Sequence, residues 1–325
     1  MWFEMDLEQN IFRLHRELIS KTYRHGPYRC FWICDPKLRR IHKATVRDRV
    51  LHHAVFRILN LVFDPTFIPT SFSCRLGRGT HRGVMAVEKM LRGVSRNYTH
   101  PGYVLKCDVK KFFDSVDHNI LLEILGRRIK DQEVMWLLKM IVESHPAITR
   151  ERERESKNAG EIGLPEGRTG IPIGNLTSQL FANIYLNEFD QFVKHKLKVK
   201  NYARYTDDFV IISEDKNYLN NLLVPVRSFL WQKLKLELHP QKVEIRKLRH
   251  GIDFLGYVIL PYHRILRSRT KRRMFRKLKQ RFEDYPKRII SKESFQASLL
   301  SYLGMLSHCQ GYGLSEELEN YYWVC

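Results

Sequence analysis

The segment that most restricts the fold of this chain runs from Tyr202 to Ser213, with the sequence Tyr-Ala-Arg-Tyr-Thr-Asp-Asp-Phe-Val-Ile-Ile-Ser. Two runs rich in aromatic and β-branched residues flank Asp207 and Asp208, and such runs favour β-strands. Acidic residues between two strands are typical of a turn. The segment therefore predicts a β-hairpin that carries two adjacent carboxylates at its turn.

A second strand with an acidic end precedes this hairpin in the sequence. Tyr103 to Asp108 reads Tyr-Val-Leu-Lys-Cys-Asp, which predicts a strand that delivers Asp108 to a sheet edge near Asp207 and Asp208. Three clustered carboxylates can hold two Mg²⁺ ions about 4 Å apart, which stabilise the attacking and leaving oxygens of phosphoryl transfer. Each acid alone is equally typical of a turn or helix cap, so the prediction depends on the combination.

The rest of the chain alternates between helical periodicity and irregular segments. A short strand pair is predicted for Ile252 to Ile259, and an exposed loop for Thr149 to Gly170, which is dense in Arg, Glu and Gly. Apolar residues recur at helical spacing at 7–20, 48–63, 175–197 and 222–234, and another helix begins near Ile120.

The charge of the chain favours a polyanionic partner. Lys and Arg number 56 against 35 Asp and Glu, a net charge of +21, which makes nucleic acid the leading partner class. An anionic membrane surface is the competing partner. No run approaches the roughly 18 apolar residues of a spanning helix, and the first residues lack a signal-peptide layout. We therefore expect a cytoplasmic protein without a membrane partner.

Basic residues concentrate in three stretches. Two of them, Arg39 to Arg49 and the Gly-rich Ser71 to His81, are candidates for phosphate contact, with solvated charge as the alternative. The third, Arg264 to Lys279, has nine Lys or Arg and no acid. This stretch predicts a basic helical subdomain with one apolar face made by Ile265, Met274, Phe275 and Leu278.

Several motifs, in this order, resemble those of reverse transcriptases. Leu105-Lys-Cys-Asp-Val-Lys-Lys-Phe-Phe-Asp-Ser-Val116 resembles the family's first aspartate motif, and Tyr205-Thr-Asp-Asp208 resembles its Y-x-D-D box. Between them, Gly170-Ile-Pro-Ile-Gly-Asn-Leu-Thr-Ser-Gln179 is similar to the segment under the incoming nucleotide. Lys242 and Phe254-Leu-Gly-Tyr257 follow, and the resemblance covers about residues 30 to 280.

The resemblance implies an α+β, right-hand polymerase fold, with an antiparallel palm sheet plus helices and a helical thumb. Its implied domains are fingers with an N-terminal helical region at 1–100, a palm at 101–260 and a basic helical thumb at 261–325. The palm includes the charged loop at about 149–170 and the nucleotide-pocket motif at 170–179.

The resemblance also assigns roles to individual residues. Lys242 would protonate the pyrophosphate leaving group, and Phe113 would exclude a 2′-hydroxyl, which predicts deoxynucleotides as substrates. Phe112 and Phe113 could instead both be core, and one must be if they point to opposite faces. Two Mg²⁺ would be bound by Asp108, Val109, Asp207 and Asp208; the nucleotide by Arg75, Val109, Phe113, Ile173, Gly174 and Gln179; and nucleic acid by Arg78, Arg267, Arg269, Lys271, Arg272 and Arg273.

The string Ile173-Gly-Asn-Leu-Thr-Ser-Gln179 points to one branch of the family. Most members carry glutamine before this glycine and proline after the serine, whereas this pattern resembles diversity-generating retroelement reverse transcriptases. An aliphatic Ile173 removes a polar contact that could check base-pair geometry, so lower fidelity is implied. The branch further implies errors at template adenines, a template-repeat RNA and its cDNA duplex as partners, and a small basic oligomeric accessory protein in a bacterial or phage-encoded system.

Two alternatives remain open from the sequence. One is another compact bacterial reverse transcriptase, of retron, group II intron or phage-defence type, although the Ile173 string argues against the first two. The other is an RNA-binding protein that has kept the fold and lost polymerisation, although Asp108, Asp207 and Asp208 argue against it.

Overall fold

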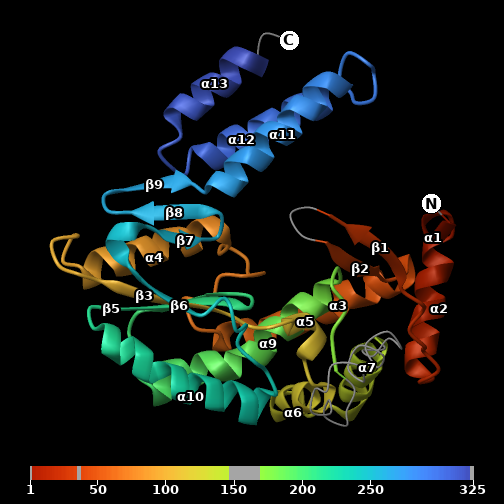
Figure 1. The fold of residues 1–325 in the computed structure, drawn as a ribbon. Helices are drawn as coiled ribbons and strands as arrows, with labels where there is room; N and C mark the ends of the chain where they lie inside the picture. The colour runs from red at the N-terminus through yellow and green to blue at the C-terminus, as the bar shows by residue number, and fades with distance from the viewer. Residues whose placement is uncertain (1, 35–37, 146–168, 323–325) are drawn as a thin grey trace, which may run out of the picture.

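The computed structural model describes residues 2–34, 38–145 and 169–322 (Figure 1). The predicted charged loop at 149–170 therefore lies outside the described residues, apart from Thr169 and Gly170.

A four-stranded antiparallel sheet with the order β4-β5-β3-β6 forms the palm of the structure (Figure 1). Its strands are β3 (Tyr103–Asp108), β4 (Tyr202–Tyr205), β5 (Asp208–Ser213) and β6 (Glu244–Lys247). The predicted strand and hairpin are both confirmed, and they are neighbours in this sheet.

Each face of this palm sheet packs on its own core because successive strand residues point to opposite faces. Leu105, Cys107 and Ile211 pack with α9 (Leu176–Gln191) and α10 (Lys216–Leu234). On the other face, Val104 and Val210 pack with α4 (Thr80–Val94). Figure 1 shows α9 and α10 below the sheet and α4 above it.

The region before the palm sheet contains a hairpin that the sequence analysis missed. Strands β1 (Arg29–Ile33) and β2 (Arg39–Lys43) pair as a separate two-stranded sheet, named here the fingers hairpin. Arg39 to Arg49 had been read only as a basic stretch, because charged residues hide the strand's alternation. The predicted helices around it are confirmed as α2 (Leu7–Ile19) and α3 (Val46–Phe63), with α1 (Trp2–Met5) and η1 (Asp64–Thr66) at their flanks.

The helices of the middle region follow the predicted periodicity. The helix expected from Ile120 begins at His118, and the one expected from Leu222 begins earlier, at Lys216. The stretch expected at 175–197 is α9 followed by a π-helical turn. The remaining elements are α5 (Phe112–Ser115), α6 (His118–Arg128), α7 (Gln132–Glu143), η2 (Phe192–Lys196) and η3 (Leu248–His250).

A second antiparallel sheet connects the palm to the C-terminal helices. The predicted pair is confirmed as β7 (Ile252–Phe254) and β8 (Tyr257–Leu260), and β9 (His263–Leu266) adds a third strand. Ile265 therefore lies in β9, and its assignment to a helix was wrong. The predicted boundary between 260 and 261 cuts this sheet, so we place the start of the helical region at α11.

Three helices form this C-terminal region: α11 (Ser268–Asp284), α12 (Lys292–Leu306) and α13 (Tyr312–Tyr322). Met274 and Leu278 of α11 are buried in the same core as α4, and Phe275 packs against its edge. The predicted apolar face therefore exists for these three residues. Several basic residues of α11, among them Arg269, Lys271 and Arg272, are exposed.

Candidate active site

The hairpin turn between β4 and β5 brings the three predicted carboxylates to one end of the palm sheet. Tyr205 pairs with Asp208, so Thr206 and Asp207 form a two-residue turn. Thr206 has φ +54°, a left-handed conformation of the kind that primed hairpin turns use. Asp108 is the register partner of Asp208 across β3 and β5.

A backbone bond ties this turn to the neighbouring strand. The Val109 amide donates to the Asp207 carbonyl at 3.2 Å. The Val109 side chain is aliphatic and buried, so the metal role that the resemblance assigns to Val109 belongs to its backbone carbonyl.

The charges of the three carboxylates act on one another. Burial, followed by the charges of Asp207 and Asp108, raises the pKa of Asp208 to about 6. Burial also raises the pKa of Asp207, with a further contribution from Asp108. Crowded hard oxygen ligands of this kind fit divalent cations such as Mg²⁺, which would relieve the repulsion. Within the described ranges, however, no three acidic, imidazole or thiol side chains are arranged so that they could hold a metal ion together.

Lys242 places a cation against these carboxylates. Its Nζ donates to Asp108 Oδ2 at 2.8 Å. The segment that carries it is fixed by backbone bonds, from the His239 amide to the Asp108 carbonyl at 2.8 Å and from the Lys242 amide to the His239 carbonyl at 3.1 Å. The structure thus brings Lys242 together with Asp108 across 134 residues of sequence.

A buried ion pair contacts the turn between β4 and β5, and the sequence analysis did not identify it. Arg204 Nη2 is 2.6 Å from Asp190 Oδ2, and Arg204 Nε donates to Asp190 Oδ1 at 2.8 Å. The same guanidinium donates to the Thr206 carbonyl at 3.0 Å and to Ser71 Oγ at 3.0 Å. The sequence signal for this pair was the charged Arg204 within the otherwise apolar and aromatic strand Tyr202–Tyr205.

The two phenylalanines of the first motif have different environments. Phe112 is buried, whereas Phe113 is only partly buried and faces Phe112 edge-on at 5.4 Å. Both residues lie in α5 rather than at a strand end. The expectation that they point to opposite faces assumed a strand and was therefore wrong in its reasoning. The Phe113 carbonyl accepts from the Ile171 amide at 2.7 Å, which joins this position to the nucleotide-pocket motif.

The nucleotide-pocket motif turns sharply before it enters α9. Ile173 is half-buried, and Gly174 is exposed with φ +117°. Gln179 lies exposed in the first turns of α9. The Ile173 carbonyl accepts from the His42 amide at 2.9 Å, so the motif contacts the fingers hairpin.

Arg75 does not have the free guanidinium that triphosphate binding needs. Its Nε and Nη2 donate to the Asp64 carboxylate at 2.7 and 3.3 Å, and the other N–H groups donate to the carbonyls of Asp64, Ile68 and Ser71. The side chain is 7% exposed. The assignment of Arg75 to the triphosphate was therefore wrong, because its guanidinium is bonded within its own loop. Arg78 in the same loop is exposed.

Arg39 is a cation near the carboxylates that the site assignment omitted. It lies in β2, and its charge lowers the pKa of Asp207 against the larger effect of burial. The only sequence signal for a role of Arg39 at this site was its position in the basic stretch Arg39 to Arg49.

The predicted basic contacts of the C-terminal region lie at or near the start of α11. Arg267 Nε pairs with Asp253 Oδ2 at 2.8 Å, so this charge is partly neutralised. Lys271 Nζ lies over the Phe275 ring at 5.8 Å from its centroid. Arg269, Lys271 and Arg272 are exposed and Arg273 is half-buried, which gives α11 a basic outer surface.

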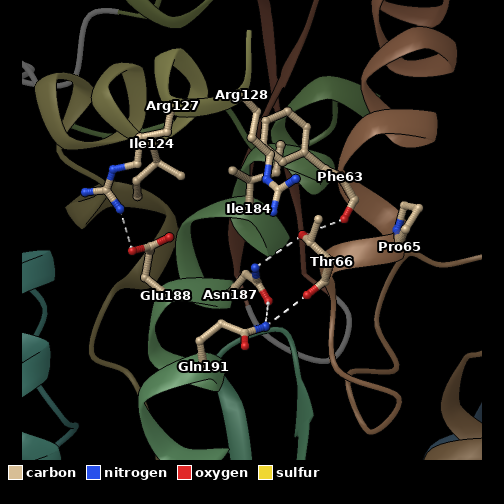
Figure 2. A pocket seen from close by; sticks show the side chains of 10 residues that line it. All are labelled: Phe63, Pro65, Thr66, Ile124, Arg127, Arg128, Ile184, Asn187, Glu188 and Gln191. Carbon is tan, nitrogen blue, oxygen red and sulfur yellow. Dashed lines mark hydrogen bonds and ion pairs between the residues drawn. The ribbon is translucent and has the colours of Figure 1, made fainter. Parts of the chain in front are cut away.

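A separate cavity of about 670 Å³ lies between the end of α3, α6 and α9 (Figure 2). Gln191 Nε2 donates to the Thr66 carbonyl at 2.9 Å, and Arg127 pairs with Glu188 at 2.8 Å across its rim. The cavity contains none of the predicted site residues, so we do not assign it to the polymerase site.

Across the described ranges, the helices are too short or too polar to cross a bilayer.

Comparisons with known proteins identify the family of the chain. A model of the reverse transcriptase (RNA-dependent DNA polymerase) family matches residues 34–259. Protein YkfC of Escherichia coli (strain K12) is 28% identical over 294 residues, covering 79% of this chain and 71% of that protein. The group II intron-encoded protein LtrA of Lactococcus lactis subsp. cremoris is 25% identical over 331 residues, covering 82% of this chain and 51% of LtrA.

The fold is also similar to that of telomerase. The structure from Candida albicans, solved with a TWJ fragment of telomeric RNA, gives a TM-score of 0.53 at 11% identity over 91% of this chain and 55% of that chain. This likeness shows the right-hand polymerase fold. The chain spans about half the length of LtrA and of this telomerase. With the family match over most of its length, the chain belongs to the reverse transcriptase family and has relatives among group II intron-encoded proteins.

Proposed function

We propose that this protein is an RNA-directed DNA polymerase that uses two Mg²⁺ ions. The pairing of Asp108 with Asp208 beside Asp207 is the observation that supports this proposal most directly. These carboxylates and the Val109 carbonyl would hold the metal. Bound there, Mg²⁺ stabilises the charge on the attacking and leaving oxygens of nucleotidyl transfer.

Two other residues contribute to the proposed reaction. The Lys242 ammonium lies at the carboxylates, where it can donate a proton to the pyrophosphate oxygen as the bond to the α-phosphate breaks. Phe113 presents a partly buried ring next to the nucleotide-pocket motif and would exclude a ribose 2′-hydroxyl. Template RNA, the RNA/cDNA duplex and deoxynucleoside triphosphates are therefore the proposed ligands.

The basic outer surface of α11 is the proposed binding surface for the phosphates of the duplex. Exposed Arg269, Lys271 and Arg272 lie on one helix whose opposite side is buried, and phosphate contacts of this kind are independent of sequence. Arg78 is the proposed contact on the fingers side.

We further propose that the protein makes error-prone cDNA from a template-repeat RNA, as a diversity-generating retroelement polymerase does. Ile173 supports this, because a half-buried aliphatic side chain replaces a polar one at the nucleotide pocket. The proposal includes errors at template adenines, a small basic accessory protein and a cytoplasmic location in a bacterium. A compact group II intron-like polymerase of ordinary fidelity is the second candidate, supported by the similarity to YkfC and LtrA.

The two candidates differ in the errors of the product. The purified protein would extend a primer on an RNA template that contains all four bases, and the DNA would be sequenced. Substitutions concentrated opposite adenines support the retroelement function, and accurate DNA supports the group II intron-like one. Bound RNA without any product, also after native RNA and the accessory protein are added, would point to an RNA-binding protein.

A matched pair of variants then tests Ile173. Ile173→Gln should lower the error rate, because it restores a polar contact in the pocket, while Ile58→Gln changes an exposed isoleucine of α3 and should leave the error rate unchanged. An identical error spectrum in both variants would remove Ile173 from the account.

A further inference from the structure

Asn175 occupies the N-cap position of α9, yet its side chain does not cap the helix. Asparagine at this position ordinarily accepts from a backbone amide of the first helical turn. Here Asn175 Oδ1 accepts from the Ala44 amide at 3.2 Å, and Nδ2 donates to the His42 carbonyl at 2.8 Å. The side chain is therefore directed to the end of strand β2 and the residue after it.

Only a primary amide satisfies both partners. The Ala44 N–H requires an acceptor and the His42 carbonyl requires a donor, and Asn supplies both from one planar group. Asp would offer only acceptors. Asn175 is 3% exposed, so loss of either bond would leave a buried polar group without a partner.

The backbone on either side continues the same contact. The His42 amide donates to the Ile173 carbonyl at 2.9 Å, so three hydrogen bonds join the nucleotide-pocket motif to His42 and Ala44. Gly174 lies so close to Ile41 that an added Cβ would approach Ile41 Cγ2 to 2.7 Å. The two segments are packed without space between them.

Among the residues that the structure describes, the fingers hairpin has few other attachments. Its two strands join no third strand within the described residues, and all five residues of β1 are exposed. Two-stranded sheets are marginally stable on their own. A ring contact between His42 and His145, with centroids 4.6 Å apart, is a further anchor on the same strand. Asn175 therefore provides two of the hydrogen bonds that attach the end of the hairpin to the palm.

This attachment fixes two parts of the candidate site relative to each other. On one side is Ile173, at the nucleotide pocket. On the other is strand β2, which carries the exposed Arg39. We propose that Asn175 is a positioning residue that holds the fingers hairpin to the nucleotide-pocket motif and thereby sets nucleotide selectivity. The effect on selectivity rests on the proposed polymerase function. The attachment of the hairpin by Asn175 is independent of that function.

Hydrogen–deuterium exchange tests the attachment without any catalysis. In Asn175→Ala the Ala44 amide loses its acceptor, so exchange at Ala44 and along β2 should accelerate about tenfold, while exchange in β3 and β5 stays unchanged. The matched control is Asn187→Ala, which removes an amide from the same helix on the side facing the separate cavity. Unchanged exchange in β2 of Asn175→Ala would overturn the proposal.

Kinetics then test the effect on selectivity. Asn175→Asp keeps the shape of the side chain and loses the donor, so it should raise the KM for deoxynucleotides about tenfold with a smaller change in kcat, shift the error spectrum, and leave RNA affinity unchanged. An equal fall in kcat at constant KM and constant error spectrum would show a purely structural role and contradict the proposal. A wild-type protein that makes no DNA would refute the proposed function instead, and the exchange result would still decide the attachment.

Discussion

Asp108 lies directly opposite Asp208 across the antiparallel pair of β3 and β5, with Asp207 in the adjoining turn. This arrangement concentrates negative charge that burial leaves poorly solvated, and it raises the pKa of Asp208 to about 6. The consequences for stability, metal binding and catalysis can be tested separately.

Without divalent metal, Asp208 should destabilise the fold as the pH rises. An acid whose pKa is raised in the folded state contributes stability below its unfolded pKa, and this stability is lost as the pH rises through about 6. Asp208→Asn should therefore be more stable than the wild type at about pH 7.5 in EDTA, and the advantage should shrink towards about pH 4. Thermal unfolding of both proteins across this range measures the difference. Mg²⁺ should raise the wild-type Tm more than that of the variant, and an equal response would argue against metal binding at Asp208.

Breaking the buried pair of Arg204 and Asp190 should cost substantial stability. Asp190→Asn leaves a guanidinium that is 1% exposed without its counter-ion, and such losses cost about 3–5 kcal/mol. Chemical denaturation measures the change. Arg127→Ala provides the comparison, because Arg127 pairs with Glu188 at the surface and should cost less than about 1 kcal/mol. Similar losses for the two variants would show that the buried pair has no special role.

Arg75 and Arg39 should respond differently to truncation. Arg75→Ala removes five internal hydrogen bonds and should lower the Tm, with any loss of activity following the loss of folded protein. Arg39→Ala removes an exposed charge that lowers the pKa of Asp207, so it should raise the KM for deoxynucleotides severalfold at an unchanged Tm. Steady-state kinetics and thermal unfolding on both variants measure this. A higher KM for Arg75→Ala at wild-type stability would restore Arg75 as the triphosphate contact.

Gly174 should not tolerate a side chain. Its φ of +117° disfavours any L-residue, and an added Cβ would meet Ile41, so Gly174→Ala should destabilise the protein by about 1–3 kcal/mol. Gly304→Ala is the control, because its added Cβ meets nothing within 4 Å in α12 and should stabilise by about 0.5–1 kcal/mol. The free energy of unfolding distinguishes them. The double variant Gly174→Ala/Ile41→Ala should regain the stability lost to the clash with Ile41. It should not regain the stability lost to the unfavourable φ.

Sequence reasoning placed the three candidate carboxylates because each lies at the end of a β-prone run and within a motif that resembles a reverse transcriptase motif. The aromatic and β-branched residues of Tyr103–Asp108 and Tyr202–Ser213 predicted the strands that bring Asp108, Asp207 and Asp208 to one end of the sheet. The fingers hairpin was missed because Arg39, Arg40 and Lys43 obscure the alternation of β2.

The residues that support the site could not be found in this way. Arg204 and Asp190 are 14 positions apart on different elements, and Asn175 meets Ala44 across 131 positions. Such pairings depend on how α9 packs between the palm sheet and α3, which periodicity does not specify. For the same reason the sequence did not predict the hydrogen-bond partners of Arg75, and Arg75 was predicted to bind the triphosphate.

The most direct test of the central claim is primer extension on an RNA template with deoxynucleotides and Mg²⁺, comparing wild type with Asp207→Asn and measuring RNA affinity for both. The account predicts DNA from the wild type and at least a roughly thousandfold slower reaction from the variant at unchanged RNA affinity, because a metal ligand is lost and no RNA contact is. Undiminished synthesis by Asp207→Asn would contradict the assignment of the catalytic carboxylates.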